Sequence, residues 1–381
     1  DLYEPDVEPA STSWDVDPNP DDYGDDHKSM DDEDSEEEGA QGRKKLQPRS
    51  LPPRGHAHRP MMPYVGIDLM DYGGGVVGQG AAQIDLAQIG EDLYLSLVLG
   101  TVFVGDNWAV APRLPIRFRL IDVSPKSESF VREKDWDEAS DYARILAFFR
   151  YGHIGSPLYI RVGELTGATV GHGSFVNRYY NTIDIDHYQG GTYGFMDGDV
   201  LGGEWLIDNL FDPDLLVGRL FYRPLDSVED LPFAAEKIKF GATFGVDHDA
   251  PLQMKVNDDG DLILEDDNPV VAQSGVLTFS GFDLEVPAVS RPHLDVVPYL
   301  DVNFLDMGGL EGSGTHTGSY INFRFSPLTS LRTRLEYRYS SGGYEPNYVN
   351  GFYEVQRVRH RSGVTKLAWL RDQTLNAGRS G

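Results

Sequence analysis

Residues 331–339, Leu-Arg-Thr-Arg-Leu-Glu-Tyr-Arg-Tyr, constrain the fold more than any other segment of the chain. Successive side chains of a β-strand point to opposite faces, so the Leu and Tyr side chains would share one face and the charged side chains the other. Such a strand fits a soluble sheet whose apolar face packs inward. It fits equally a transmembrane β-barrel, in which the apolar face meets lipid and the charged face lines an aqueous interior.

The same alternation recurs along the chain, between turns rich in Gly, Pro, Asp and Asn. Several alternating segments exceed the roughly 5–6 residues of a typical soluble strand and approach the roughly 9–11 residues that cross a membrane. Residues 140–149 also alternate, and we assign them to a strand rather than to a helix. We therefore predict strands at residues 93–104, 114–121, 143–151, 158–163, 215–223, 237–246, 276–286, 294–304, 319–325, 331–339 and 352–358, with further strands within residues 65–72 and 191–207.

The pattern predicts an all-β fold: an antiparallel transmembrane β-barrel over residues 61–381, after a disordered acidic arm and Pro-rich linker over residues 1–60. Tyr residues beside the loops would form the aromatic girdles of such a barrel. The alternative is a soluble, secreted β-sandwich that binds carbohydrate. In a barrel the following side chains would line the lumen: Arg161, Arg219, Arg223, Arg324, Arg332, Arg334, Glu336 and Arg338.

The charge of the chain restricts its partners. Residues 1–42 hold 17 Asp and Glu and one Lys, and the whole chain carries a net charge of −28. Phosphate binding needs a basic surface, so we expect no nucleic-acid partner. The expected partners are outer-membrane lipid and, through the acidic arm, other envelope proteins. The chain starts without Met, which suggests a removed leader, and residues 371–381 are expected to be a loop. Either further strands follow in a longer natural chain, or the barrel closes with another element.

The sequence gives few candidates for chemistry. It contains no Cys, which excludes disulfides, thiolate metal sites and a Cys nucleophile. Asp258, Asp259 and Asp261 resemble part of a calcium loop, although a Gly-containing hairpin turn explains them as well. We place His172, between two Gly residues, in a polar extracellular loop. Asp184, Asp186 and His187 of the same loop could form a metal site with it, but the spacing of these residues matches no known pattern of metal ligands. We expect no cofactor, no catalytic residues and no enzymatic activity, and a surface hydrolase is kept as an alternative.

Several segments together resemble a known class of proteins. Leu158–Gly163, Gly-His-Gly at residues 171–173, Asn-Arg-Tyr at 177–179 and Gly-Arg-Leu-Phe-Tyr-Arg-Pro at 218–224 are similar to large outer-membrane β-barrels of Gram-negative bacteria, of a poorly characterised myxobacterial type. Some barrels of that type belong to gliding-motility machinery. The resemblance implies an outer-membrane location and a role as a structural anchor, as a component of an envelope complex, or as a passive pore.

Overall fold

The computed structural model describes residues 77–379, apart from residues 90–91, 124–128, 138, 183–187, 227, 229–230, 259–260, 266–267 and 327–328. The arm and linker predicted for residues 1–60 and the strand predicted at residues 65–72 lie outside the described residues. The same holds for Asp184, Asp186 and His187.

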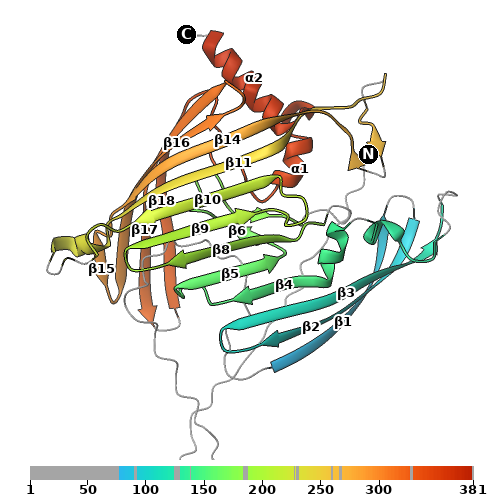
Figure 1. The fold of residues 1–381 in the computed structure, drawn as a ribbon, viewed down its shortest axis with the longest axis horizontal. Coiled ribbons are helices and arrows are strands. Elements are labelled where there is room, and N and C mark those ends of the chain that lie inside the picture. Colours follow the sequence, from blue (N-terminus) through green and yellow to red (C-terminus); the bar gives the residue numbers. More distant parts are fainter. Residues whose placement is uncertain are drawn as a thin grey trace, which may run out of the picture. The chain divides into compact units, whose positions relative to one another are not determined.

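One large antiparallel sheet dominates the described residues (Figure 1). Its hydrogen-bonded order is β1-β2-β3-β4-β5-β8-β9-β10-β11-β14-β16-β17-β18, and β15 pairs beside β16. Neighbouring strands follow one another along the chain, so each step is a hairpin or a longer loop. The prediction of an antiparallel all-β fold is confirmed. Among the described residues the order ends at β1 and at β18 without a pairing between them, and no described helix is long and apolar enough to cross a membrane.

The strands of this sheet are β1 (Val77–Ile89), β2 (Asp92–Val104), β3 (Trp108–Ile121), β4 (Leu146–Tyr151), β5 (Leu158–Gly163), β8 (Gly191–Asp197), β9 (Leu201–Ile207), β10 (Leu215–Tyr222), β11 (Lys239–Met254), β14 (Val271–Glu285), β15 (Val289–Arg291), β16 (Leu294–Asp306), β17 (Glu311–Ser326) and β18 (Thr329–Ser340). Two small sheets pair β6 (Thr166–Ala168) with β7 (Tyr179–Tyr180) and β12 (Leu264–Glu265) with β13 (Asn268–Pro269). The helices are α1 (Tyr353–Val358), α2 (Lys366–Arg379) and the short 3₁₀ helices η2 (Glu133–Asp135), η3 (Ser140–Ile145), η4 (Pro232–Lys237) and η5 (Arg361–Gly363).

Three predicted elements were wrong. The strand predicted at residues 352–358 is replaced by the helix α1 (Tyr353–Val358). Its two buried side chains, Tyr353 and Arg357, are spaced four residues apart, as on one helix face. The loop predicted for residues 371–381 is helical up to Arg379, within α2. Residues 140–145 form the 3₁₀ helix η3, so the strand predicted to begin at residue 143 begins at Leu146.

The two faces of the sheet differ in chemistry. In β10 the side chains of Leu215, Val217, Arg219 and Phe221 are buried, whereas Leu220 between them is 72% exposed. Residues that pair across neighbouring strands lie on the same face, so the division into a buried and an exposed face extends from β10 to its neighbours. We call the face with Arg219 the inner face and the face with Leu220 the outer face.

The outer face carries large apolar side chains in contact with solvent. Leu220 and Phe282 both flank Ala242 in the cross-strand register, and they are 72% and 65% exposed. On β18, Leu335 is 63% and Tyr337 is 68% exposed. Among the described residues, the apolar side of strands such as β18 is therefore the uncovered side of the sheet.

Two segments cover the inner face. We call the described residues between β5 and β8, 164–182 and 188–190, the inner loop, and residues 341–379 the C-terminal segment. The Asn177 amide donates to the Val349 carbonyl at 2.9 Å, and the Val349 amide donates to the Phe175 carbonyl at 3.0 Å. Phe175 also packs on Phe279 of β14, with ring centroids 4.6 Å apart. The two segments and the sheet thus form a single apolar core, and α1 and α2 lie near one end of β11 (Figure 1).

Candidate functional site

A Gly-His-Gly turn in the inner loop sets the geometry of the site. Gly171 and Gly173 have φ values of +59° and +77°, which L-residues with a side chain rarely adopt. A Cβ atom at Gly171 would also approach Cδ of Arg219 to 3.0 Å. The glycines therefore allow the turn to press against the sheet, and His172 between them reaches the inner face.

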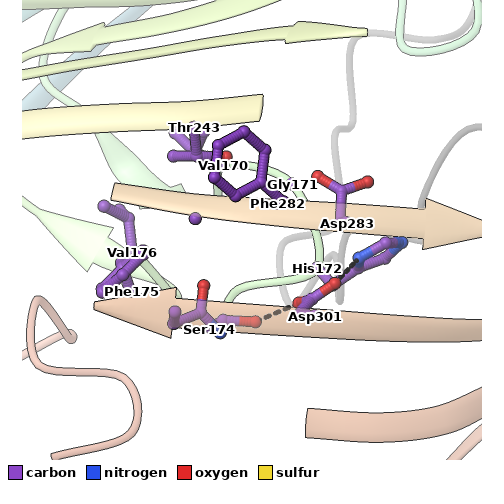
Figure 2. Close-up of a pocket in the computed structure, with 12 residues that line it drawn as sticks. Val170, Gly171, His172, Ser174, Phe175, Val176, Thr243, Phe282, Asp283 and Asp301 are labelled. Carbon is purple, nitrogen blue, oxygen red and sulfur yellow. Dashed lines mark hydrogen bonds and ion pairs between the residues drawn. The ribbon is translucent and has the colours of Figure 1, made fainter. Parts of the chain in front are cut away.

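His172 is held between carboxylates of two strands. Its Nδ1 lies 2.7 Å from Oδ1 of Asp301 on β16, and its Nε2 lies 3.1 Å from Oε2 of Glu285 on β14 (Figure 2 shows the contact with Asp301). Both partners accept hydrogen bonds, so both ring nitrogens donate and the ring is an imidazolium. Burial lowers the pKa of His172, but the carboxylates, chiefly Asp301, outweigh it and raise the pKa from 6.5 to about 9. The ring also stacks on Tyr299, with centroids 4.4 Å apart.

Arg219 links two further carboxylates on the same face. Its Nε and Nη2 donate to both oxygens of Asp283 at 2.9 and 2.6 Å, and its Nη1 donates to Glu204 at 2.6 Å. Lys239 forms a 2.9 Å ion pair with Glu285, which also contacts His172. Each charge is buried beside an opposite charge, as buried ions must be. We call this set the inner charge cluster: His172, Glu204, Arg219, Lys239, Asp283, Glu285 and Asp301.

All the side chains that the sequence assigns to a lumen lie on the inner face: Arg161, Arg219, Arg223, Arg324, Arg332, Arg334, Glu336 and Arg338. Most are paired there; Arg223, for example, donates to Asp197 at 2.7 Å. Glu336 accepts from both Arg334 and Arg338. The structure brings only Arg219 of this set into the inner charge cluster.

His172 was predicted to lie in a polar extracellular loop, and the structure shows that its side chain is 0% exposed and is docked on the sheet rather than facing solvent. The extracellular side stays a prediction. The other members of the cluster were missed as site residues: Glu204, Lys239, Asp283, Glu285 and Asp301. Alternation places such side chains on the polar face of a sheet, but it does not specify which loop or strand supplies their partners.

The inner charge cluster has some features of a metal site and of a catalytic site. His172, Asp283 and Asp301 offer ligand atoms within 4.8 Å of one another, beside a cavity of about 10 Å³. However, both Asp283 oxygens already accept from Arg219, and both His172 nitrogens face carboxylates. Ser174 donates to Asp301 rather than to the imidazole, so it lacks the contact that would activate a nucleophile (Figure 2). The arrangement therefore fits a structural ionic lock better than a metal or catalytic centre.

The calcium candidates lie elsewhere. Asp258 and Asp261 belong to a turn in which the Asn257 amide donates to the Asp261 carbonyl at 2.9 Å, and Asp259 lies outside the described residues. This turn agrees with the hairpin alternative, and calcium binding there stays a prediction.

Docking of the inner loop is expected to depend on pH. The folded-state pKa of His172, about 9, lies above the ordinary value of 6.5, so its stabilising effect is complete below 6.5 and is lost as pH rises through 9. Hydrogen exchange of the inner-loop amides, corrected for the intrinsic rate, should therefore rise between pH 7 and 10. In His172→Gln the corrected exchange should be faster at pH 7 and nearly flat with pH. Parallel pH profiles in the two proteins would contradict the assignment.

Comparison with known proteins gave likenesses in fold only. No protein-family model matches the sequence, and no curated protein matches it. Among solved structures, a loop L8 deletion mutant of OmpT, an outer membrane protein of Vibrio cholerae, aligns at 10% identity and a TM-score of 0.32, over 69% of this chain and 82% of that chain. An anion-selective porin from Comamonas acidovorans aligns at 11% identity and a TM-score of 0.27, over 73% and 92% of the two chains. Likenesses at these scores carry no argument about function, which has to be inferred from the side chains of this chain.

Proposed function

We propose that this chain is an outer-membrane β-barrel protein whose outer face meets lipid. The observation that carries the proposal is the inside-out distribution of side chains. Leu220, Phe282 and Tyr337 are each more than 60% exposed on the outer face, while Arg219 on the inner face is 1% exposed. A soluble sandwich buries its apolar face and exposes its charges, whereas a membrane barrel does the reverse.

Within the barrel we propose a structural anchor rather than an open pore or an enzyme. The C-terminal segment is fixed to the sheet by buried charges, since Arg357 donates to Asp214 at 3.0 Å and contacts Asp247 at 3.4 Å. Lys366 donates to the Tyr348 carbonyl at 2.6 Å. The inner loop and the C-terminal segment share a buried core with the inner face of the sheet, and this packing supports a filled rather than an open interior. Recruitment of envelope proteins by the acidic residues 1–60 extends the proposal, and a place in gliding machinery stays a hypothesis from resemblance alone.

The decisive experiment combines extraction with conductance. We expect the protein to stay with membranes through salt and carbonate washes and to leave them only in detergent. In planar bilayers we expect no steady current from the wild type, and intermittent openings from His172→Ala, in which the inner loop loses its contacts with Asp301 and Glu285. Solubility without detergent would overturn the membrane assignment. A steady wild-type current would overturn the anchor and favour the passive pore.

A further inference from the structure

In the described part of the chain, one edge of the strand β1 has no pairing partner, and natural sheets do not normally leave such an edge uncovered. Among the described residues it pairs only with β2. Its 13 residues contain no Lys, Arg or Pro, the residues that usually protect an edge from further pairing. Ile84 and Leu86 are 68% and 67% exposed. In lipid no water can satisfy unpaired backbone groups, so β1 needs a second partner.

The direction of the strands specifies that partner. From β1 to β18 the described sheet runs through thirteen successive strands, each antiparallel to the next, with β15 alongside β16. An odd number of alternating strands leaves β1 and β18 pointing the same way, so they cannot pair antiparallel with each other. Single-chain outer-membrane barrels have an even number of antiparallel strands. This step rests on the proposed function, and it calls for one more strand, antiparallel to both.

We propose that residues 64–72 supply this strand and pair with the free edge of β1. They read Tyr-Val-Gly-Ile-Asp-Leu-Met-Asp-Tyr and lie immediately before β1 in the chain, joined to it by three Gly and a Val at residues 73–76. A short Gly-containing connection makes a hairpin, so the added strand runs antiparallel to β1. It therefore also has the direction that an antiparallel neighbour of β18 requires.

The register follows from matching the faces. On β1, Ala82 and Ile84 lie on the outer face, because they pair with Leu99 and Leu97 of β2. Pairing residue 72 with residue 77 places Val65 opposite Ile84 and Ile67 opposite Ala82, so that apolar side chains continue the outer face. A slip by one residue would turn Ile67 inward and expose Asp68 to lipid.

Disulfide trapping tests the pairing, and the chain lends itself to it because it has no Cys. Ile67→Cys with Ala82→Cys should oxidise to an intramolecular disulfide in the detergent-folded protein, since directly opposed residues have Cα atoms about 4.5–5.5 Å apart. The matched control, Ile67→Cys with Gln83→Cys, places the second thiol on the opposite face, because Gln83 pairs with Val98 rather than with a residue of the outer face. We expect it to oxidise at least about tenfold more slowly, because its Cβ vectors point apart.

Two results would overturn the inference. One is equal or slower oxidation of the 67/82 pair relative to the 67/83 pair, in protein that still requires detergent. The other is a disulfide between two copies through Ala82→Cys alone, which would show that a second chain covers the edge. Because detergent dependence is read on the same samples, failure of this pairing is distinguishable from failure of the membrane assignment.

Discussion

Arg219→Ala is expected to lower the free energy of unfolding by about 3–5 kcal/mol, the cost of removing one partner from a buried ion pair. Arg219 is 1% exposed and holds both oxygens of Asp283 and one oxygen of Glu204. Without the guanidinium, the carboxylates of Asp283 and Glu204 would lose the counter-charge that they contact directly. Urea unfolding of the detergent- or lipid-folded protein should show a lower midpoint with an unchanged slope.

Arg332→Ala is the matched control. Arg332 lies on the same inner face, opposite Asn322, but its side chain is exposed. Its removal should change the unfolding free energy by no more than about 0.5 kcal/mol, as for most surface substitutions. If the two alanine variants unfold at the same urea concentration, the inner charge cluster does not stabilise the fold. Arg219→Lys should fall between them, because an ammonium cannot reproduce the bidentate fork.

The strands were predictable because their signal is local. Leu158–Gly163 was predicted with the observed bounds, and Leu215–Tyr222 was predicted to within one residue. A period of two needs only neighbouring residues to be recognised. Prediction from neighbouring residues alone was wrong at α1. Tyr353 and Arg357 are buried there because the C-terminal segment packs as a helix, not because they alternate along a strand. Six residues are too few to separate the two periods.

The site was not predictable because its contacts are long-range. His172 meets Glu285 and Asp301 across 113 and 129 residues, and Arg219 meets Asp283 across 64 residues. Alternation shows that these side chains face the polar side of a sheet, but it does not show which loop folds onto that side. The two Gly residues around His172 were visible as a turn, and they became informative only with the Arg219 side chain beside them.

Leu220→Arg is expected to destabilise the membrane-folded protein by about 2–4 kcal/mol if its row lies near the bilayer midplane, and by less toward the interfaces. Leu220 pairs with Gly203 and Ala242 on the outer face and is 72% exposed. In a soluble sheet a residue so exposed would accept Arg with a change of no more than about 0.5 kcal/mol. The size of the effect therefore reports whether lipid or water surrounds this face. Urea titration after folding into lipid vesicles, read by gel mobility of unheated samples, measures it.

Leu375→Arg provides the control for the added charge itself. Leu375 is 49% exposed on α2, outside the sheet, so its substitution should leave the urea midpoint nearly unchanged. Phe282→Arg, in the same outer row as Leu220, should repeat the loss because Ala242 lies between the two side chains in the register. If all three arginine variants unfold at the wild-type urea concentration, water surrounds the outer face. The apolar side of the strands would then need a protein partner rather than a bilayer.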